Sequence, residues 1–68
     1  MKVEKYRINA NKDQLNGFGI DCDINGLIGE IKHKYSTGWY AIEITHTYDS
    51  VTFTNIFDIP KTFLQRIY

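Results

Sequence analysis

The segment whose residue types and spacing most resemble a functional motif covers residues 21–30 and reads DCDINGLIGE. An EF-hand calcium loop needs oxygen ligands at positions 1, 3 and 5, glycine at 6, an aliphatic residue at 8 and a bidentate glutamate at 12. Five positions fit in order: Asp21, Asp23, Asn25, Gly26 and Ile28. Position 12 is Lys32, however, and Glu30 comes two residues too early. We therefore interpret the segment as an acidic turn rather than a calcium site.

The pair Asn25-Gly26 supports the turn, because both residue types tolerate a positive φ. We expect Asp21 and Asp23 to cap it through hydrogen bonds from their side chains to the backbone. With Glu30 they give residues 17–30 a net charge of −3, next to +2 for residues 1–16. A basic partner surface and plain solubility both explain this acidic segment.

Cys22, His33 and His46 are the other side chains that could bind a metal ion or attack a substrate. None has a close metal-ligand spacing such as C-x₂-C or H-x₃-H. The two histidines fall on the inward faces of neighbouring predicted strands, and we interpret them as hydrogen-bonded or partly exposed residues. No nucleophile elbow, phosphate loop or zinc-protease motif occurs. We expect no catalytic residue, no metal site and no cofactor.

Alternation of apolar and polar residues predicts the strands that must carry any site. The clearest strand is Trp39–Tyr48, whose inward face holds Tyr40, Ile42, Ile44, His46 and Tyr48. Residues 36–38 and 49–50 are turn signals on either side of it. Residues 9–16 read as a polar loop, with a short helix as the alternative. Pro60 favours a single helical turn because its φ is fixed and it has no N–H. The remaining predicted strands are residues 3–8, 27–35, 51–54 and 65–68.

Size and charge limit the functions that this chain can carry. Its 68 residues predict one domain, 1–68, with a small core and a stability of about 5 kcal/mol or less. Eight basic residues balance eight acidic ones, which argues against a nucleic-acid binder that works by bulk charge. The single cysteine allows no internal disulfide, and we see neither a signal peptide nor a membrane span. We expect a cytoplasmic protein.

The predicted fold is mainly β: about five short antiparallel strands, closed into a small barrel, with one 3₁₀ turn near Pro60. Closure suits so small a domain because it removes exposed edges. Two stretches resemble the SH3-like barrel family: Gly38–Ala41, which is similar to its paired aromatic residues, and Ile59–Leu64, which is similar to the proline and 3₁₀ turn before its last strand. The resemblance implies that Trp39, Pro60 and Phe63 line a binding groove.

We expect a non-enzymatic module that binds a protein, of the kind that phage and mobile elements encode as accessory proteins or inhibitors of host factors. The predicted binding surface is Trp39, Tyr40, Pro60 and Phe63, with Tyr35 and Tyr48 at its rim. For Trp39 two interpretations stay open: contact with a partner, or cover for one end of the barrel. A homodimer is a further expectation, because an exposed edge strand drives self-association.

The alternative is a barrel that binds single- or double-stranded nucleic acid through a strand face with lysine and aromatic residues. Lys32 and Lys34, beside Tyr35 and Trp39, would form this face. Lys2, Lys5 and Arg7 would extend it if the first strand lies alongside.

Overall fold

The protein is one five-stranded antiparallel sheet with a short helix on one side. The computed structural model of the chain describes residues 3–67. In chain order the elements are β1 (Lys5–Ile8), α1 (Lys12–Gly17), β2 (Ile28–Lys34), β3 (Trp39–Tyr48), β4 (Val51–Pro60), the 3₁₀ turn η1 (Lys61–Phe63) and β5 (Leu64–Arg66). The strands lie in the order β4-β3-β2-β1-β5. The predicted fold class, the strand Trp39–Tyr48 and the 3₁₀ turn after Pro60 are confirmed.

The predicted closure into a barrel is wrong. Among the described residues β4 and β5 are the two edges of the sheet and do not pair with each other. β5 has three residues and pairs only with β1, so it is too short to close the sheet against a ten-residue β4. β4 is longer than the predicted strand 51–54, since it pairs with β3 along its whole length from Val51 to Pro60.

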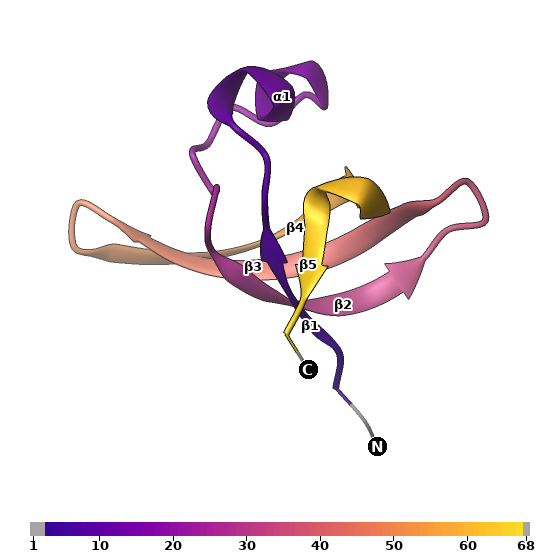
Figure 1. The fold of residues 1–68 in the computed structure, drawn as a ribbon. Helices are drawn as coiled ribbons and strands as arrows, with labels where there is room; N and C mark the ends of the chain where they lie inside the picture. Colours follow the sequence, from indigo (N-terminus) through magenta and orange to yellow (C-terminus); the bar gives the residue numbers. More distant parts are fainter. Residues whose placement is uncertain (1–2, 68) are drawn as a thin grey trace.

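The core lies between one face of the sheet and the segment 10–27 that covers it. Its fully buried members come from the strands and from this cover: Ile8, Leu15, Ile24, Ile42, Ile44 and Ile59. Gly29 lets β2 approach β3 closely, because a Cβ there would collide with the Glu43 carbonyl and the side chains of Ile42 and Ile44. Figure 1 shows α1 above the sheet, with the β2–β3 and β3–β4 hairpins reaching out on opposite sides.

Residues 9–16 were predicted to be a polar loop with a short helix as the alternative, and the helix α1 forms there over Lys12–Gly17. A capping box begins it: the Gln14 N–H donates to Asn11 Oδ1 and the Asn11 N–H donates to Gln14 Oε1, each over 2.9 Å. Six residues do not make a stable helix in isolation, so packing must stabilise this one. That packing comes from Leu15, which is completely buried.

A bulge in β2 changes the faces that alternation predicts for its second half. Ile31 lies opposite Ile42, but His33 lies opposite Ala41 and Lys34 opposite Tyr40. One extra residue in β2 therefore reverses the inward and outward positions after Ile31. His33 is exposed and lies on the other face from His46, so the prediction that both histidines point inward is wrong for His33.

Candidate functional site

An acidic loop, residues 21–23, stands out from the cover of the core. The residues on either side, Ile20 and Ile24, are both buried and hold it in place. Asp21, Cys22 and Asp23 are all exposed. Two fixed ends separated by three residues leave the loop little freedom, so its carboxylates occupy a defined region of the surface.

Asn25 and Gly26 form the predicted turn. The Leu27 N–H donates to the Ile24 carbonyl over 3.2 Å, and Gly26 has a φ of 85°. Asn25 Oδ1 accepts a hydrogen bond of 3.1 Å from the Ala10 N–H. The predicted capping by Asp21 and Asp23 is wrong, since among residues 3–67 neither carboxylate has a hydrogen bond to the backbone. Asn25 makes the side-chain bond that holds the turn, and both aspartates stay available to solvent.

The end of the β3–β4 hairpin projects beyond the core as an arm, which we define as residues 45–54. Ile44 is the last buried residue of β3, and Tyr48 lies about 13 Å farther along the strand. The arm ends in a two-residue turn, Asp49-Ser50, whose φ angles are 51° and 64°. Both φ angles are positive, as in a type I′ turn, whose backbone twist matches that of the two flanking strands. The arm is therefore regular structure without a core of its own.

Apolar side chains continue along the arm on the face that further back forms the core. His46 and Tyr48 follow Ile42 and Ile44 at every second residue, and Phe53 lies opposite His46. The exposed fraction is 74% for Tyr48 and 43% for Phe53. The His46 and Phe53 rings lie 5.7 Å apart, and His46 Nε2 lies 3.3 Å from Asn55 Nδ2. This face has the residue types of a core but nothing in the described chain covers it.

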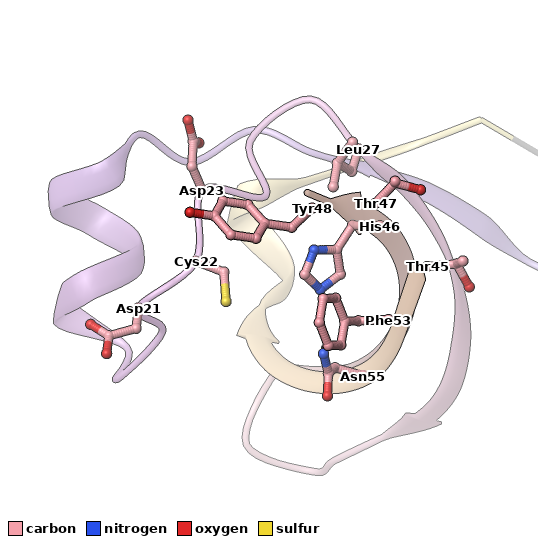
Figure 2. A pocket seen from close by; sticks show the side chains of 10 residues that line it. All are labelled: Asp21, Cys22, Asp23, Leu27, Thr45, His46, Thr47, Tyr48, Phe53 and Asn55. Atoms are coloured by element: carbon pink, nitrogen blue, oxygen red, sulfur yellow. The ribbon is translucent and has the colours of Figure 1, made fainter. Parts of the chain in front are cut away.

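The arm and the acidic loop enclose an open groove of about 770 Å³, which we call the arm groove. Figure 2 shows Tyr48, His46 and Phe53 on the arm opposite Cys22 of the loop, with the Asp21 and Asp23 carboxylates directed outward on either side of Cys22. The lining includes two carboxylates and no lysine or arginine. Its residues are Asp21, Cys22, Asp23, Leu27, Thr45, His46, Thr47, Tyr48, Phe53 and Asn55. The groove is therefore apolar at its wall and negative at its rim.

Three of the four residues in the predicted binding surface, Trp39, Pro60 and Phe63, lie close together. They gather around Phe18, which the prediction did not include. Trp39 lies opposite Pro60 in the ladder, and the ring of Phe18 contacts both Trp39 (5.6 Å) and Phe63 (5.1 Å). Trp39, Pro60 and Phe63 are all half-buried. Much of the apolar surface at this position is thus covered by the chain itself, which favours the interpretation of Trp39 as cover for the end of the sheet.

Of the other members of that surface, Tyr35 lies next to Trp39, since its N–H donates to the Trp39 carbonyl over 2.8 Å, whereas Tyr40 and Tyr48 lie elsewhere. Tyr40 is buried, with its ring at 5.7 Å from that of Tyr6. Tyr35 is exposed and its hydroxyl is hydrogen-bonded to the Asp58 carboxylate, which raises the pKa of Tyr35. Tyr48 is at the opposite end of β3 from Trp39, about 30 Å away. Tyr48 therefore belongs to the arm groove and not to a rim around Trp39.

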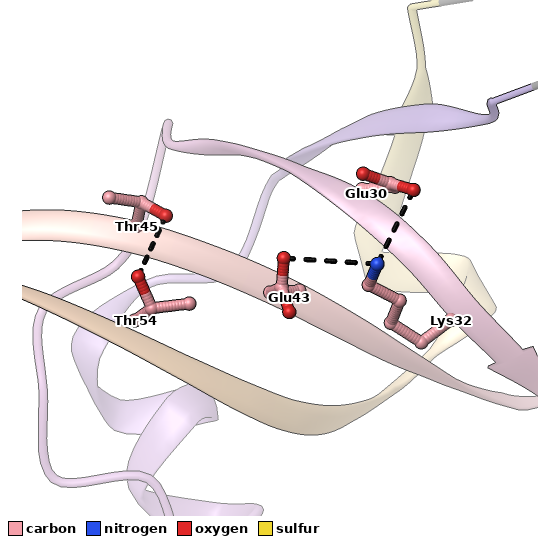
Figure 3. A network of polar contacts seen from close by, with 5 residues as sticks. All are labelled: Glu30, Lys32, Glu43, Thr45 and Thr54. Atoms are coloured by element: carbon pink, nitrogen blue, oxygen red, sulfur yellow. Dashed lines mark hydrogen bonds and ion pairs between the residues drawn. The ribbon is translucent and has the colours of Figure 1, made fainter.

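The basic residues of the nucleic-acid alternative do not form one free patch. Lys32 Nζ lies 3.4 Å from Glu30 and 3.9 Å from Glu43 on the outer face (Figure 3). Lys34 is on the other face because of the bulge, 5.3 Å from the centre of the Tyr40 ring. Lys5 and Arg7 are exposed on β1, and Lys2 lies outside the described residues. Lys32 is thus paired with Glu30 and Glu43 on one face, and Lys34 is paired with Glu4 on the other.

Glu4 joins the first strand to the end of β2 and to β5. The Lys34 ammonium donates to it over 2.8 Å, and Arg66 Nη1 lies 3.3 Å away. The hydrogen bond from Lys34 lowers the pKa of Glu4, and the positive charges of Lys34 and Arg66 act in the same direction. The same bond raises the pKa of Lys34. Lys34 thus has a structural partner at neutral pH.

Several exposed apolar residues of the arm were not part of the predicted site: Val51, Phe53 and, at its base, Ile56. The sequence contains a signal for them. The apolar alternation of Trp39–Tyr48 is longer than a core of this size can bury, so its end and the strand paired with it must be exposed.

Among residues 3–67, no three side chains of His, Cys, Asp or Glu gather closely enough to hold a metal ion. No helix in this range has the length and apolar character needed to span a bilayer.

Comparisons with known proteins add no assignment. No protein-family model matches the chain, and no curated protein sequence or solved structure is significantly similar to it.

Proposed function

We propose that this protein is a non-catalytic binding module that takes an apolar segment of a partner protein, flanked by lysine or arginine, into the arm groove. The observation that carries the proposal is the apolar face of the arm beyond the core, next to an acidic loop whose two carboxylates lie at the rim of the groove. Exposed apolar patches next to polar rims mark interaction sites more often than chance. Aromatic residues are also the side chains that contribute most to protein–protein binding.

The charge of the groove selects the chemistry of the partner. Asp21 and Asp23 line it, Asp49 lies at the tip of the arm, and no basic side chain other than His46 contributes to the lining. A basic residue on the partner would gain a carboxylate partner at a solvent-exposed rim, where such pairs contribute mainly to specificity and association rate. The affinity itself would come from apolar groups that bury Tyr48 and Phe53.

A relationship to SH3-like barrels is part of the same proposal. Five antiparallel strands and a 3₁₀ turn between the last two support it. The open sheet and the self-covered cluster of Phe18, Trp39 and Phe63 differ from what that family would imply for the binding surface. For this reason we place the site at the arm groove and not at Trp39.

Two synthetic peptides test the proposal: three leucines between two lysines, and the same leucines between two glutamates. Titration of ¹⁵N-labelled protein with the lysine peptide should shift the amides of Cys22, His46, Tyr48 and Phe53. The glutamate peptide should bind several-fold more weakly, because it brings like charges to the rim. Raising the salt concentration should reduce this difference.

Matched variants locate the effect. Asp21→Asn combined with Asp23→Asn should remove the preference for lysine, whereas Asp13→Asn, an exposed carboxylate of α1 outside the groove, should keep it. Equal binding of both peptides by the native protein would refute the role of the acidic loop. Shifts confined to Trp39 and Phe63 would instead place the binding surface where the family resemblance implies.

A further inference from the structure

The outer edge of β4 offers a row of backbone groups that the chain does not use. In a two-residue hairpin the residues next to the turn, Tyr48 and Val51, form a hydrogen-bonded pair, and such pairs recur at every second position. Phe53, Asn55 and Phe57 therefore direct their N–H and C=O groups toward β3. Thr52, Thr54, Ile56 and Asp58 direct theirs away from the sheet, and no described strand pairs with that side.

Over residues 51–57 this edge has none of the features that normally prevent pairing between molecules. Natural edge strands are protected by lysines, prolines, bulges or short length. Residues 51–57 of β4 contain no charged residue and no proline, and all ten residues of β4 follow β3 without a bulge. Ile56 adds an apolar side chain that is 58% exposed on the outer face.

We propose that a second copy of this chain occupies the edge, with the two β4 strands antiparallel around a twofold axis at Asn55. In this register Thr54 of one copy lies opposite Ile56 of the other, and Thr52 lies opposite Asp58. All four outward-facing residues then form hydrogen-bonded pairs, with about eight backbone hydrogen bonds across the axis. The two five-stranded sheets become one continuous ten-stranded sheet.

Side chains on both faces are complementary in this register. Phe53 faces Phe57 of the second copy at a position without backbone hydrogen bonds, where cross-strand side chains are closest. In this register Asp58 lies opposite the uncharged Thr52, so no two like charges meet along the paired strands. A register centred on Asp58 would instead bring two like charges together. The centre at Asn55 avoids this repulsion and is the one that pairs all four outward-facing residues within β4.

The size of the contact sets its strength. A seven-residue strand pair with side chains on both faces buries on the order of 1,000 Å² in total, at the lower end for specific interfaces. A net charge of zero adds no long-range repulsion between copies. We therefore expect a dimer that forms at micromolar to millimolar protein concentration and dissociates on dilution.

Amide hydrogen exchange at several protein concentrations tests the register directly. Exchange at Thr52, Thr54, Ile56 and Asp58 should slow as concentration rises, whereas Phe53, Asn55 and Phe57 should be equally protected throughout. Sedimentation velocity on the same samples should show the dimer. A chain that stays monomeric at millimolar concentration would overturn the proposal, and so would a dimer that leaves those four amides unchanged.

Two variants challenge the same interface. Thr54→Pro removes an N–H that has no acceptor within the monomer, and it should weaken the dimer about tenfold or more through two lost hydrogen bonds, one per copy. Thr45→Ala is the matched control, because it removes the same 3.1 Å hydroxyl contact between Thr45 and Thr54 without altering the edge. Ile56→Lys is a second variant: its ammonium faces Glu43 in the monomer, and it should weaken the dimer like a natural edge lysine. If these edge variants dimerise as well as the native protein, the interface is elsewhere.

Discussion

The arm can be removed without unfolding the rest of the protein. The deletion takes out Thr45–Tyr48 and Val51–Thr54 and keeps the turn Asp49-Ser50, so that Ile44 and Asn55 flank the turn. Ile44 and Asn55 are a hydrogen-bonded pair, as Tyr48 and Val51 are, so the same turn type fits. Eight residues leave the chain, and none of them is buried.

The expected change in stability follows from what those residues contribute. Four cross-strand side-chain pairs stabilise by about 0.2–1 kcal/mol each, and backbone hydrogen bonds add to this. The backbone entropy lost on ordering the arm opposes these gains, which is why an isolated hairpin is marginal in water. We expect the two to offset each other, with a change in the free energy of unfolding within about 1 kcal/mol.

Urea unfolding and a ¹⁵N–¹H spectrum check this expectation. The deletion variant should unfold near the same urea concentration and keep the amide positions of the residues around the core. Ile44→Ala is the comparison, because it opens a cavity at a fully buried site and should cost about 2–5 kcal/mol. If the deletion variant loses as much stability as Ile44→Ala, the arm is part of the cooperative core, and its exposed apolar face needs no functional explanation.

Two more predictions follow from contacts around β2. Gly29→Ala should lower the urea midpoint strongly, since its Cβ would collide with the Glu43 carbonyl and Ile44, whereas Gly17→Ala meets no atom within 4 Å and should have little effect. Glu4 has a lowered pKa, so its ion pair stabilises at neutral pH and is lost as the pH falls through that value. NMR titration of the Glu4 carboxyl should show its pKa rising toward the ordinary range in Lys34→Met; an unchanged value would refute this contact in solution.

The sequence predicts the fold class well because the strongest strand has uninterrupted alternation. Every residue from Trp39 to Tyr48 follows it, and both ends of that strand agree with the structure. The next strand was predicted to cover only residues 51–54, and Asn55, Asp58 and Pro60 beyond it are poor strand formers. β4 continues to Pro60 since its ladder with β3 outweighs these propensities, and a proline is tolerated at the end of an edge strand.

Other features depend on contacts that residue types do not specify. No proline or glycine marks the bulge after Ile31 in the sequence. The bulge moves the Lys34 side chain to the other face of the sheet from Lys32, and this separates two lysines of the nucleic-acid alternative. The arm groove brings Asp23 near Tyr48, 25 residues later in the sequence, and no local pattern predicts that approach. The capping box at Asn11 and Gln14, by contrast, was visible as a helix start and was missed because the helix is so short.

The two proposed surfaces share the Phe53 side chain but otherwise use different parts of the same arm, and this makes them separable. The groove depends on side chains that leave the inner face, Tyr48 and Phe53, whereas the edge depends on backbone groups that point sideways from Thr52 and Thr54. Neutralising Asp21 and Asp23 should therefore change peptide preference and leave the dimer intact, while Thr54→Pro should do the reverse. If either variant abolishes both activities, the groove and the edge form one interface, and a partner segment would then have to bind in competition with the second copy.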